Sequence, residues 1–163
     1  MLHVFLNPKR NINKIIKNIL DNGDIEYRTY FPNDKNDLFN YEIVGSQSAI
    51  SLSILSKVIF PKKFILKFEN SFNIHPGTKD YPGLGYNFAL LNNELQYGAV
   101  CHYMEEAIDS GDIIIESNFD VSKNETIDSL QFKTYLHVLI VLNEFIKNYR
   151  NNNLESLPKR KWT

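Results

Sequence analysis

The sequence predicts an α/β fold with an open sheet, and three observations carry this prediction. The chain has 163 residues, which is the length of one ordinary domain. Its first part alternates between short apolar runs and an amphipathic stretch with helical spacing, which is typical of β-α-β order. A loop rich in glycine and proline, residues 75–85, follows a strand-like run, and open α/β sheets bind ligands at the carboxyl ends of their strands.

The individual elements are expected in a regular order along the chain. Short apolar or alternating runs predict strands at residues 3–6, 25–31, 41–44, 64–68, 71–74, 98–104 and 112–116. Helical spacing predicts helices at residues 11–20, 50–60 and 86–91. A long helix is predicted from a Ser-x-x-Glu capping box at residues 122–125 to about Arg150. With no internal repeat in view, we expect one domain over residues 1–150 and a polar tail over residues 151–163.

Charge and composition exclude several classes of protein. The 18 basic and 19 acidic side chains leave a net charge of −1, so no global positive field is available to hold nucleic acid. The apolar runs fall far short of the roughly 18–20 residues that span a bilayer, so no membrane association is expected. Cys101 is the only cysteine, which excludes an intrachain disulfide and indicates a reducing compartment, with the cytoplasm as the expected location. No His or Cys residues have the spacing of metal ligands, and no metal is expected.

Three polar residues are candidates for chemistry. Asn73 and His75 are two apart on a predicted strand, so both side chains should project to the same face beside the glycine-rich loop. Asp109 lies in a turn between two predicted strands, where its carboxylate could fix the tautomer of His75 or take up its proton. Each residue alone also fits a structural role, since histidine often ends a strand and aspartate often forms a turn. His102 fits either the core or the wall of a cleft.

Residues 72–111 carry three motifs that together resemble one family. The motifs are Asn-x-His-Pro-Gly from residue 73, Tyr-Pro-Gly-x-Gly-x-x-x-Ala-Leu from residue 81, and Tyr-Gly-x-x-x-His-x-Met-x-x-x-Ile-Asp-x-Gly-x-Ile-Ile from residue 97. The stretch is similar to the core of the formyltetrahydrofolate-dependent formyltransferases, and closest in pattern to those acting on nucleotide-linked amino sugars. The resemblance implies a Rossmann-like open sheet of the formyltransferase N-terminal-domain type, abbreviated by about one βα unit before Asn73.

The resemblance also implies roles for particular residues. Asn73, His75 and Asp109 correspond to the catalytic residues of the family, and N10-formyltetrahydrofolate would be the cosubstrate. Its expected contacts lie in two segments, Ser46, Gln47 and Ser48 in the first, and Met104, Glu105, Ala107 and Ile108 in the second. Gly45 and Ser46 fit an ordinary strand-to-helix turn equally well, and Glu105 also fits a solvated turn charge. Lys79, Tyr81 and Tyr86 in and after the loop could supply the cation and aromatic faces that a nucleotide sugar needs.

The expected activity is transfer of a formyl group to the amine of a nucleotide-linked amino sugar through a tetrahedral intermediate. The Asn73 amide would donate a hydrogen bond to the oxyanion, and His75 or Asp109 would accept the amine proton. Asn7-Pro8 stands where ribonucleotide enzymes of the family have a glycine-rich turn, and we expect no basic second domain for tRNA. Two alternatives remain open, an inactive folate- or nucleotide-binding module of the same fold and a formyltransferase with another amine acceptor.

A homodimer is a further expectation. Residues 135–142, in the centre of the long helix, are apolar nearly all round, and one sheet face can cover only one side. A second subunit would cover the other side, although burial under the chain's own loops explains the pattern equally well.

Overall fold

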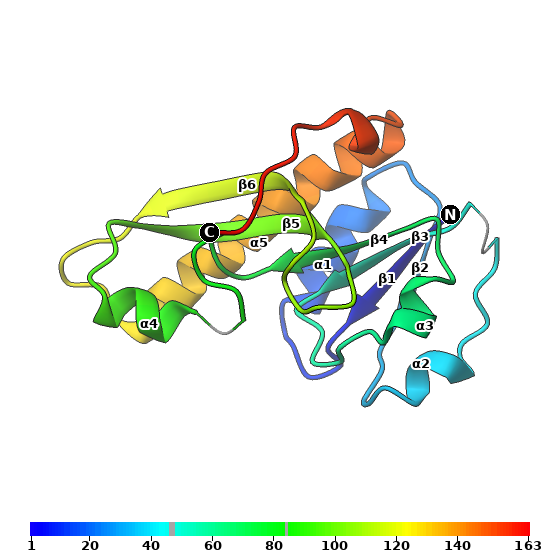
Figure 1. The fold of residues 1–163 in the computed structure, drawn as a ribbon, viewed down its shortest axis with the longest axis horizontal. Helices are drawn as coiled ribbons and strands as arrows, with labels where there is room; N and C mark the ends of the chain where they lie inside the picture. Colours follow the sequence, from blue (N-terminus) through cyan, green and yellow to red (C-terminus); the bar gives the residue numbers. More distant parts are fainter. Residues whose placement is uncertain (46–47, 84) are drawn as a thin grey trace.

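The computed structural model describes residues 1–45, 48–83 and 85–163, and their central feature is a mixed sheet. Its strands are β1 (Leu2–Leu6), β2 (Tyr27–Tyr30), β3 (Ile50–Ile54), β4 (Asn70–His75), β5 (Gln96–Tyr103) and β6 (Ile113–Asp120), in the order β2-β1-β3-β4-β5-β6. The first four strands pair in parallel, whereas β5 is antiparallel to β4 and β6 is antiparallel to β5 (Figure 1). This arrangement confirms the predicted α/β open sheet of the Rossmann-like type.

Helices cover both faces of the sheet. They are α1 (Asn13–Asp21), α2 (Asp37–Asn40), α3 (Lys62–Ile65), α4 (Tyr86–Leu91), the long α5 (Ile127–Arg150) and a 3-10 turn, η1 (Leu154–Ser156). In Figure 1, α1 and α5 lie on one side of the strands and the one-turn helices α2 and α3 lie on the other. None of the helices in the described part of the chain is long and apolar enough to cross a bilayer.

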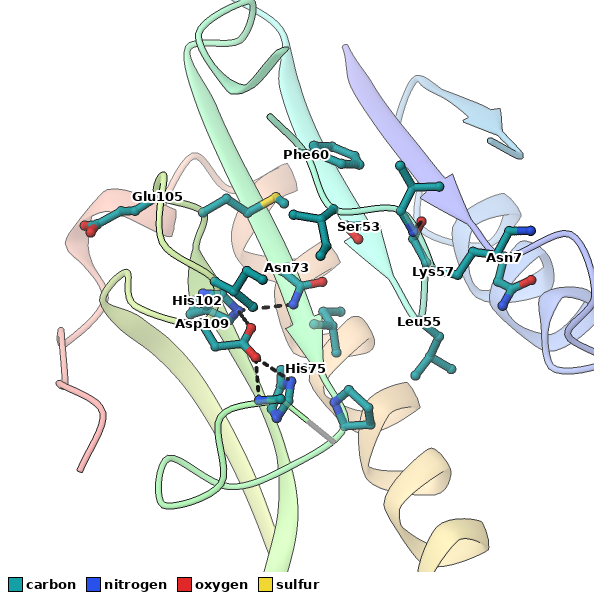
Figure 2. Close-up of a pocket in the computed structure, with 18 of the residues that line it drawn as sticks. Asn7, Ser53, Leu55, Lys57, Phe60, Asn73, His75, His102, Glu105 and Asp109 are labelled. Carbon is teal, nitrogen blue, oxygen red and sulfur yellow. Dashed lines mark hydrogen bonds and ion pairs between the residues drawn. The ribbon is translucent and has the colours of Figure 1, made fainter. Parts of the chain in front are cut away.

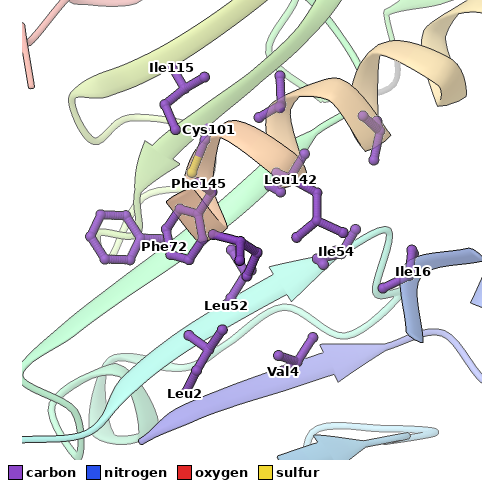
Figure 3. Close-up of a cluster of buried hydrophobic side chains, with 14 of the residues drawn as sticks. Leu2, Val4, Ile16, Leu52, Ile54, Phe72, Cys101, Ile115, Leu142 and Phe145 are labelled. Carbon is purple, nitrogen blue, oxygen red and sulfur yellow. The ribbon is translucent and has the colours of Figure 1, made fainter. Parts of the chain in front are cut away.

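The period-two alternation of the strands places two of the three core clusters on opposite faces of the sheet. Leu2 and Val4 of β1, with Leu52 of β3 and Phe72 of β4, face α1 and α5 and are fully buried (Figure 3). Phe5 points to the opposite face, where its ring centroid lies 4.9 Å from that of Phe60 and 5.5 Å from that of Phe64. Buried side chains therefore pack on both faces of the sheet, and a binding site can form only at the ends of the strands.

Most of the elements expected from the sequence are present, but residues 41–68 differ. Residues 41–44 form no strand, residues 50–60 begin with strand β3 instead of a helix, and residues 64–68 include the end of α3 instead of a strand. The serines of Ile50-Ser-Leu-Ser-Ile fit a central strand because Ser51 Oγ donates a buried hydrogen bond of 2.7 Å to Ser71 Oγ on β4. Pro61 precedes the first turn of α3, where a missing N–H costs nothing, so it opens a helix instead of closing one.

The beginning of α5 also differs from expectation. Its N-cap is Thr126, whose Oγ1 accepts from the Ser129 N–H at 3.1 Å while Ser129 Oγ accepts from the Thr126 N–H at 2.9 Å. The predicted pair Ser122 and Glu125 is hydrogen-bonded at 3.2 Å, but it closes the turn before the helix. The centre of α5 is buried on one side only: Leu136 is 44% exposed and Ile140 is 50% exposed.

Candidate active site

A cavity of about 560 Å³ opens at the carboxyl ends of the parallel strands, as the loop after β4 predicted. Asn7, Ser53 and Asn73 come from or directly follow β1, β3 and β4, so three neighbouring strands supply its floor. The antiparallel strand β5 adds His102, and the turn after it adds residues 104–109. The site therefore lies where the sheet changes from parallel to antiparallel pairing, and its volume is that of an ordinary ligand pocket.

The predicted residues Asn73, His75 and Asp109 meet in this cavity, and His102 joins them (Figure 2). His75 Nδ1 lies 3.4 Å from Asp109 Oδ2, and His102 Nε2 lies 3.2 Å from Asp109 Oδ1. Asn73 Nδ2 lies 3.2 Å from the same nitrogen of His102. One carboxylate thus faces two imidazoles, and the amide on β4 completes the cluster.

The backbone determines which imidazole nitrogens are available. His75 Nε2 donates to the carbonyl of Tyr81 at 2.9 Å, and His102 Nδ1 donates to the carbonyl of Tyr103 at 2.7 Å. A carbonyl can only accept, so in the neutral rings the other nitrogens, His75 Nδ1 and His102 Nε2, are unprotonated. Both of these nitrogens face Asp109. A proton that reaches either of them gains the attraction of the carboxylate, so the cluster is built to accept one proton and to return it.

The pKa values follow from the same geometry. Burial lowers the pKa of His75, and the nearby charge of Asp109 only partly opposes this effect. For Asp109, burial acts to raise the pKa, but a hydrogen bond to His102, the charge of His75 and the Gly83 N–H together hold it below its ordinary value. That N–H donates to Asp109 Oδ2 at 2.7 Å. Near neutral pH the site therefore presents an ionised carboxylate beside a neutral His75.

The turn that carries Asp109 adopts an uncommon backbone conformation. Asp109 has a φ of 48°, in the left-handed region that Asp and Asn tolerate better than most residues. Gly111 follows two residues later, and a Cβ there would lie 2.0 Å from the carbonyl oxygen of Tyr103. A bulkier residue at position 111 would push the turn away from β5, so the Asp-Ser-Gly sequence is what lets Asp109 reach both histidines.

Some of the residues expected to contact the folate cosubstrate line the cavity, and one does not. Met104, Glu105, Ala107 and Ile108 all line it, and Glu105 turns its carboxylate away from the cluster in Figure 2. Ser48 precedes β3 and so lies at the opposite end of that strand from the cavity, while Ser46 and Gln47 lie outside the described residues. The reason is the wrong assignment of residues 50–60. Since β3 ends at Ile54, the segment that follows it, residues 55–60, lies at the cavity end of the strand and lines the cavity, whereas Ser48 does not.

Of the residues expected to contact the acceptor, one lines the cavity. Tyr86 does so, whereas Lys79 and Tyr81 are absent from its described lining. The Tyr81 hydroxyl donates to Glu94 at 2.6 Å, and its backbone carbonyl holds His75. The Lys79 carbonyl accepts from the Thr163 N–H at 3.1 Å. Both residues support the site through the backbone, which side-chain chemistry alone could not have indicated.

Sequence reasoning missed one polar wall of the cavity. Gln131 Nε2 donates to the hydroxyl of Tyr86 at 3.1 Å and to that of Tyr135 at 3.3 Å. Arg10 Nη1 donates to the Tyr135 hydroxyl at 2.7 Å, and its guanidinium carbon lies 5.7 Å from the centre of that ring. Arg10 follows β1, so its place at the carboxyl end of a central strand was the signal that could have found it.

No group of three His, Cys, Asp or Glu side chains with a geometry suited to a metal ion occurs in the described ranges.

Solved structures with this fold include several formyltransferases. A 4-N formyltransferase from Francisella tularensis is 22% identical, with a TM-score of 0.76 over 99% of this chain and 73% of that one. An N-formyltransferase from Helicobacter canadensis, solved with folinic acid and dTDP-3-aminofucose, is 20% identical, with a TM-score of 0.75 over 99% and 67%. A phosphoribosylglycinamide formyltransferase from Anaplasma phagocytophilum is 14% identical, with a TM-score of 0.73 over 93% and 87%. At these identities the likeness concerns the fold.

Comparison with curated protein sequences found no match. The family comparison is more informative, because residues 15–142, well over half of the chain, match the formyl transferase family. This range contains the Asn73, His75, His102 and Asp109 cluster and the described lining of the cavity except Asn7 and Arg10. The chain belongs to the formyl transferase family.

Proposed function

We propose that this enzyme transfers a formyl group from N10-formyltetrahydrofolate to the amino group of a nucleotide-linked amino sugar, and that Asn73, His75 and Asp109 are its catalytic residues. The observation that carries the proposal is the cluster of an amide, two imidazoles and one carboxylate in a cavity with two unlike sides. The motif resemblance and the structural neighbours, one of which was solved with folinic acid and dTDP-3-aminofucose, support the same reaction.

The cluster provides what formyl transfer to an amine requires. Asn73 Nδ2 carries two hydrogens, so one can face His102 while the other donates to the oxygen that becomes negative in the tetrahedral intermediate. The His75 and Asp109 pair accepts the proton that the amine loses as its nitrogen bonds to the formyl carbon. The same pair returns that proton to the folate nitrogen as the old bond breaks, directly or through a water. The protein ends each cycle unchanged.

The two sides of the cavity suit different ligands. The side formed by Val58, Phe60, Met104, Ala107 and Ile108 is apolar and is suited to a pterin ring. The other side holds Arg10, Tyr86 and Tyr135, which offer a guanidinium and aromatic faces. Arginine pairs well with phosphate, and tyrosine rings pack on bases and sugars. We therefore place the folate on the first side and the nucleotide-linked sugar on the second, with the cluster between them.

The test of the acceptor compares the rates of formyl transfer to three separate acceptors. Release of tetrahydrofolate, followed by absorbance, should be faster with a nucleoside diphosphate-linked amino sugar than with glycinamide ribonucleotide or initiator tRNA, all at equal concentration. A preference for either of the last two would overturn the acceptor assignment. Absence of release with every amine would instead favour the binding-module alternative.

Arg10→Ala is expected to raise KM for the nucleotide acceptor by about tenfold and to leave KM for the folate within about twofold, because one charge-assisted contact is worth about 1.5–3 kcal/mol. The measurement is initial-rate kinetics with each substrate varied in turn. The matched control is Lys9→Ala, which removes a neighbouring cation that lies outside the described lining of the cavity. An equal rise in both KM values, or an equal effect of the control, would contradict the assignment of Arg10 to the acceptor side.

Gly77→Ala is expected to lower turnover by about tenfold or more, because the loop leaves no room for a methyl group. A Cβ at this position would lie 2.6 Å from His75 Nε2 and 3.1 Å from the hydroxyl of Tyr97. The imidazole would have to leave its hydrogen bond to the carbonyl of Tyr81, and small displacements of reacting groups are costly. Steady-state turnover and the melting temperature, measured on the same variant, separate this effect from global destabilisation. Wild-type turnover in Gly77→Ala would show that the position of this ring does not matter.

The apolar stripe on α5 supports a homodimer. Phe132, Leu136 and Ile140 are four residues apart on one face of the helix, and each retains at least 44% of its exposed surface. We expect sedimentation velocity to show a dimer and Leu136→Lys to show a monomer. A monomer mass for the wild type at every concentration would contradict this.

Cys101, the one cysteine of the sequence, is buried as a free thiol, and we propose the reducing cytoplasm as the enzyme's location.

A further inference from the structure

The last residues of the chain are held against the site by contacts from several elements. Arg160 forms an antiparallel bridge with Ile113, with N–H···O distances of 2.8 and 2.9 Å. Lys161 forms an ion pair with Asp112, and the Thr163 N–H donates to the Lys79 carbonyl in the loop after β4. Figure 1 shows this segment running past β6 to end beside β5. Residues 159–163, here named the C-terminal strap, therefore cross from β6 to the loop that borders the cavity.

Trp162 is the part of the C-terminal strap that touches the site. Its ring centroid lies 5.5 Å from that of His75 at an interplanar angle of 74°, and 5.0 Å from that of His102 at 83°. Both arrangements are in the range of favourable edge-to-face pairs. Its Nε1–H donates to the carbonyl of Gly111 at 2.9 Å. A single indole thus contacts β4, β5 and the end of the turn that carries Asp109.

These contacts restrain the orientation of the two imidazole rings and the position of the turn that carries Asp109. Each imidazole must keep one nitrogen toward a backbone carbonyl and the other toward Asp109, and rotation of the ring would break both interactions. The nearly perpendicular indole packs against both rings, and such contacts oppose their rotation. The bond to Gly111 fixes the turn relative to both rings. Accepting the proposed function, we propose that Trp162 is a positioning residue that holds His75 and His102 toward Asp109 and excludes water from their outer side.

The pKa of His75 gives this role a measurable signature. The groups that face its imidazole are the Asp109 carboxylate, the His102 imidazole and the Tyr81 carbonyl, and burial is the main cause of its lowered pKa. The indole carries no charge, so its removal would act by admitting water. The pKa of His75 should then rise toward its ordinary value, and the acid limb of the pH profile of kcat should move to higher pH.

The experiment compares Trp162→Ala and Trp162→Phe with Lys159→Ala. Lys159 is exposed in the same strap and contacts the ring of Tyr103 instead of the histidines, which makes it a matched control. Trp162→Ala should lower kcat by about 10–100-fold with less than about threefold change in either KM, since misplacement of a reacting group by about 1 Å can cost a hundredfold. Trp162→Phe retains an aromatic ring and should recover much of the loss. Lys159→Ala should match the wild type.

Imidazole NMR signals provide a readout that does not depend on activity. The chain has only four histidines, and His3 and His137 make no ring contact with Trp162 within the described residues, so they serve as internal references. Trp162→Ala should shift the signals and the titration midpoint of His75 and should shift the signals of His102, with the references unmoved. Loss of the indole ring current shifts both sets of signals in any case, so an unmoved titration midpoint of His75 would overturn the proposal, whatever the effect on kcat. If Trp162→Ala does not fold, the same comparison in Trp162→Phe decides. If the wild type transfers no formyl group to any acceptor, the proposed function fails while the NMR comparison still tests the positioning.

Discussion

Asp109→Asn is expected to lower kcat by about a hundredfold or more without loss of structure. Asparagine retains the shape of the side chain and tolerates the left-handed conformation at this position, so the turn should survive. The substitution removes the charge that faces both imidazoles, and a proton on His75 or His102 then loses its stabilising partner. Single-turnover formyl transfer, with substrate binding measured separately, assigns the loss to the chemical step.

A matched control shares the same chemical change. Asp120→Asn alters an exposed carboxylate at the end of β6, hydrogen-bonded to Gln96 at 3.1 Å, and should retain wild-type kcat. We expect kcat to decrease in Asn73→Ala and His75→Asn as it does in Asp109→Asn. In double variants kcat should be little lower than in single variants, because the effects of residues that act as a unit are not additive. A kcat within about threefold of the wild type in Asp109→Asn would remove the carboxylate from the mechanism.

Phe145→Ala is expected to destabilise the protein by about 3–5 kcal/mol, because it removes a fully buried aromatic ring from the larger core cluster. Phe145 packs edge-to-face on Phe72, with centroids 5.3 Å apart, and Phe72 directly precedes Asn73 on β4. Urea unfolding monitored by circular dichroism measures the free energy of unfolding. Phe88→Ala, on the short helix α4 and 61% exposed, should change it by no more than about 0.5 kcal/mol. Equal losses in the two variants would contradict this account of the core.

The sequence predicted the strands and helices whose periodicity is decided locally. The strands near β1, β2, β4, β5 and β6 and the helices near α1, α4 and α5 were expected, because each combines a clear period with a turn or cap signal. Apolar residues at 50 and 54 fit helical spacing as well as alternation, and the sequence therefore predicts a helix over residues 50–60. The buried pairing of Ser51 with Ser71 resolves this ambiguity, and only the folded sheet shows it.

The candidate site was predictable to the extent that motifs carried it. Asn73, His75 and Asp109 were expected to meet, and the cavity contains all three. The sequence does not decide whether His102 belongs to the core or to the wall of a cleft. The alternation along β5 indicates which face of the sheet the residue is on, but it does not indicate which residues surround it. The contribution of residues 55–60 was missed through the error in β3, since the segment after a strand can be identified only once the strand is placed. The packing of the predicted polar tail depends on a contact between residues 51 apart, beyond the reach of any local pattern.

Trp162 is also the only tryptophan in the chain, so the proposed active site contains a single intrinsic fluorophore. Its emission reports the environment of two catalytic-site imidazoles without labelling, and the nine tyrosines do not obscure it when the indole alone is excited. The strap that holds it has one isolated β-bridge, whereas α5 is anchored in the core by Val138, Leu142 and Phe145. Segments with few buried contacts open at a lower free energy than the core. Denaturant should therefore change the emission before the helical signal is lost, and the midpoint and slope of that first transition give the free energy with which the strap is docked.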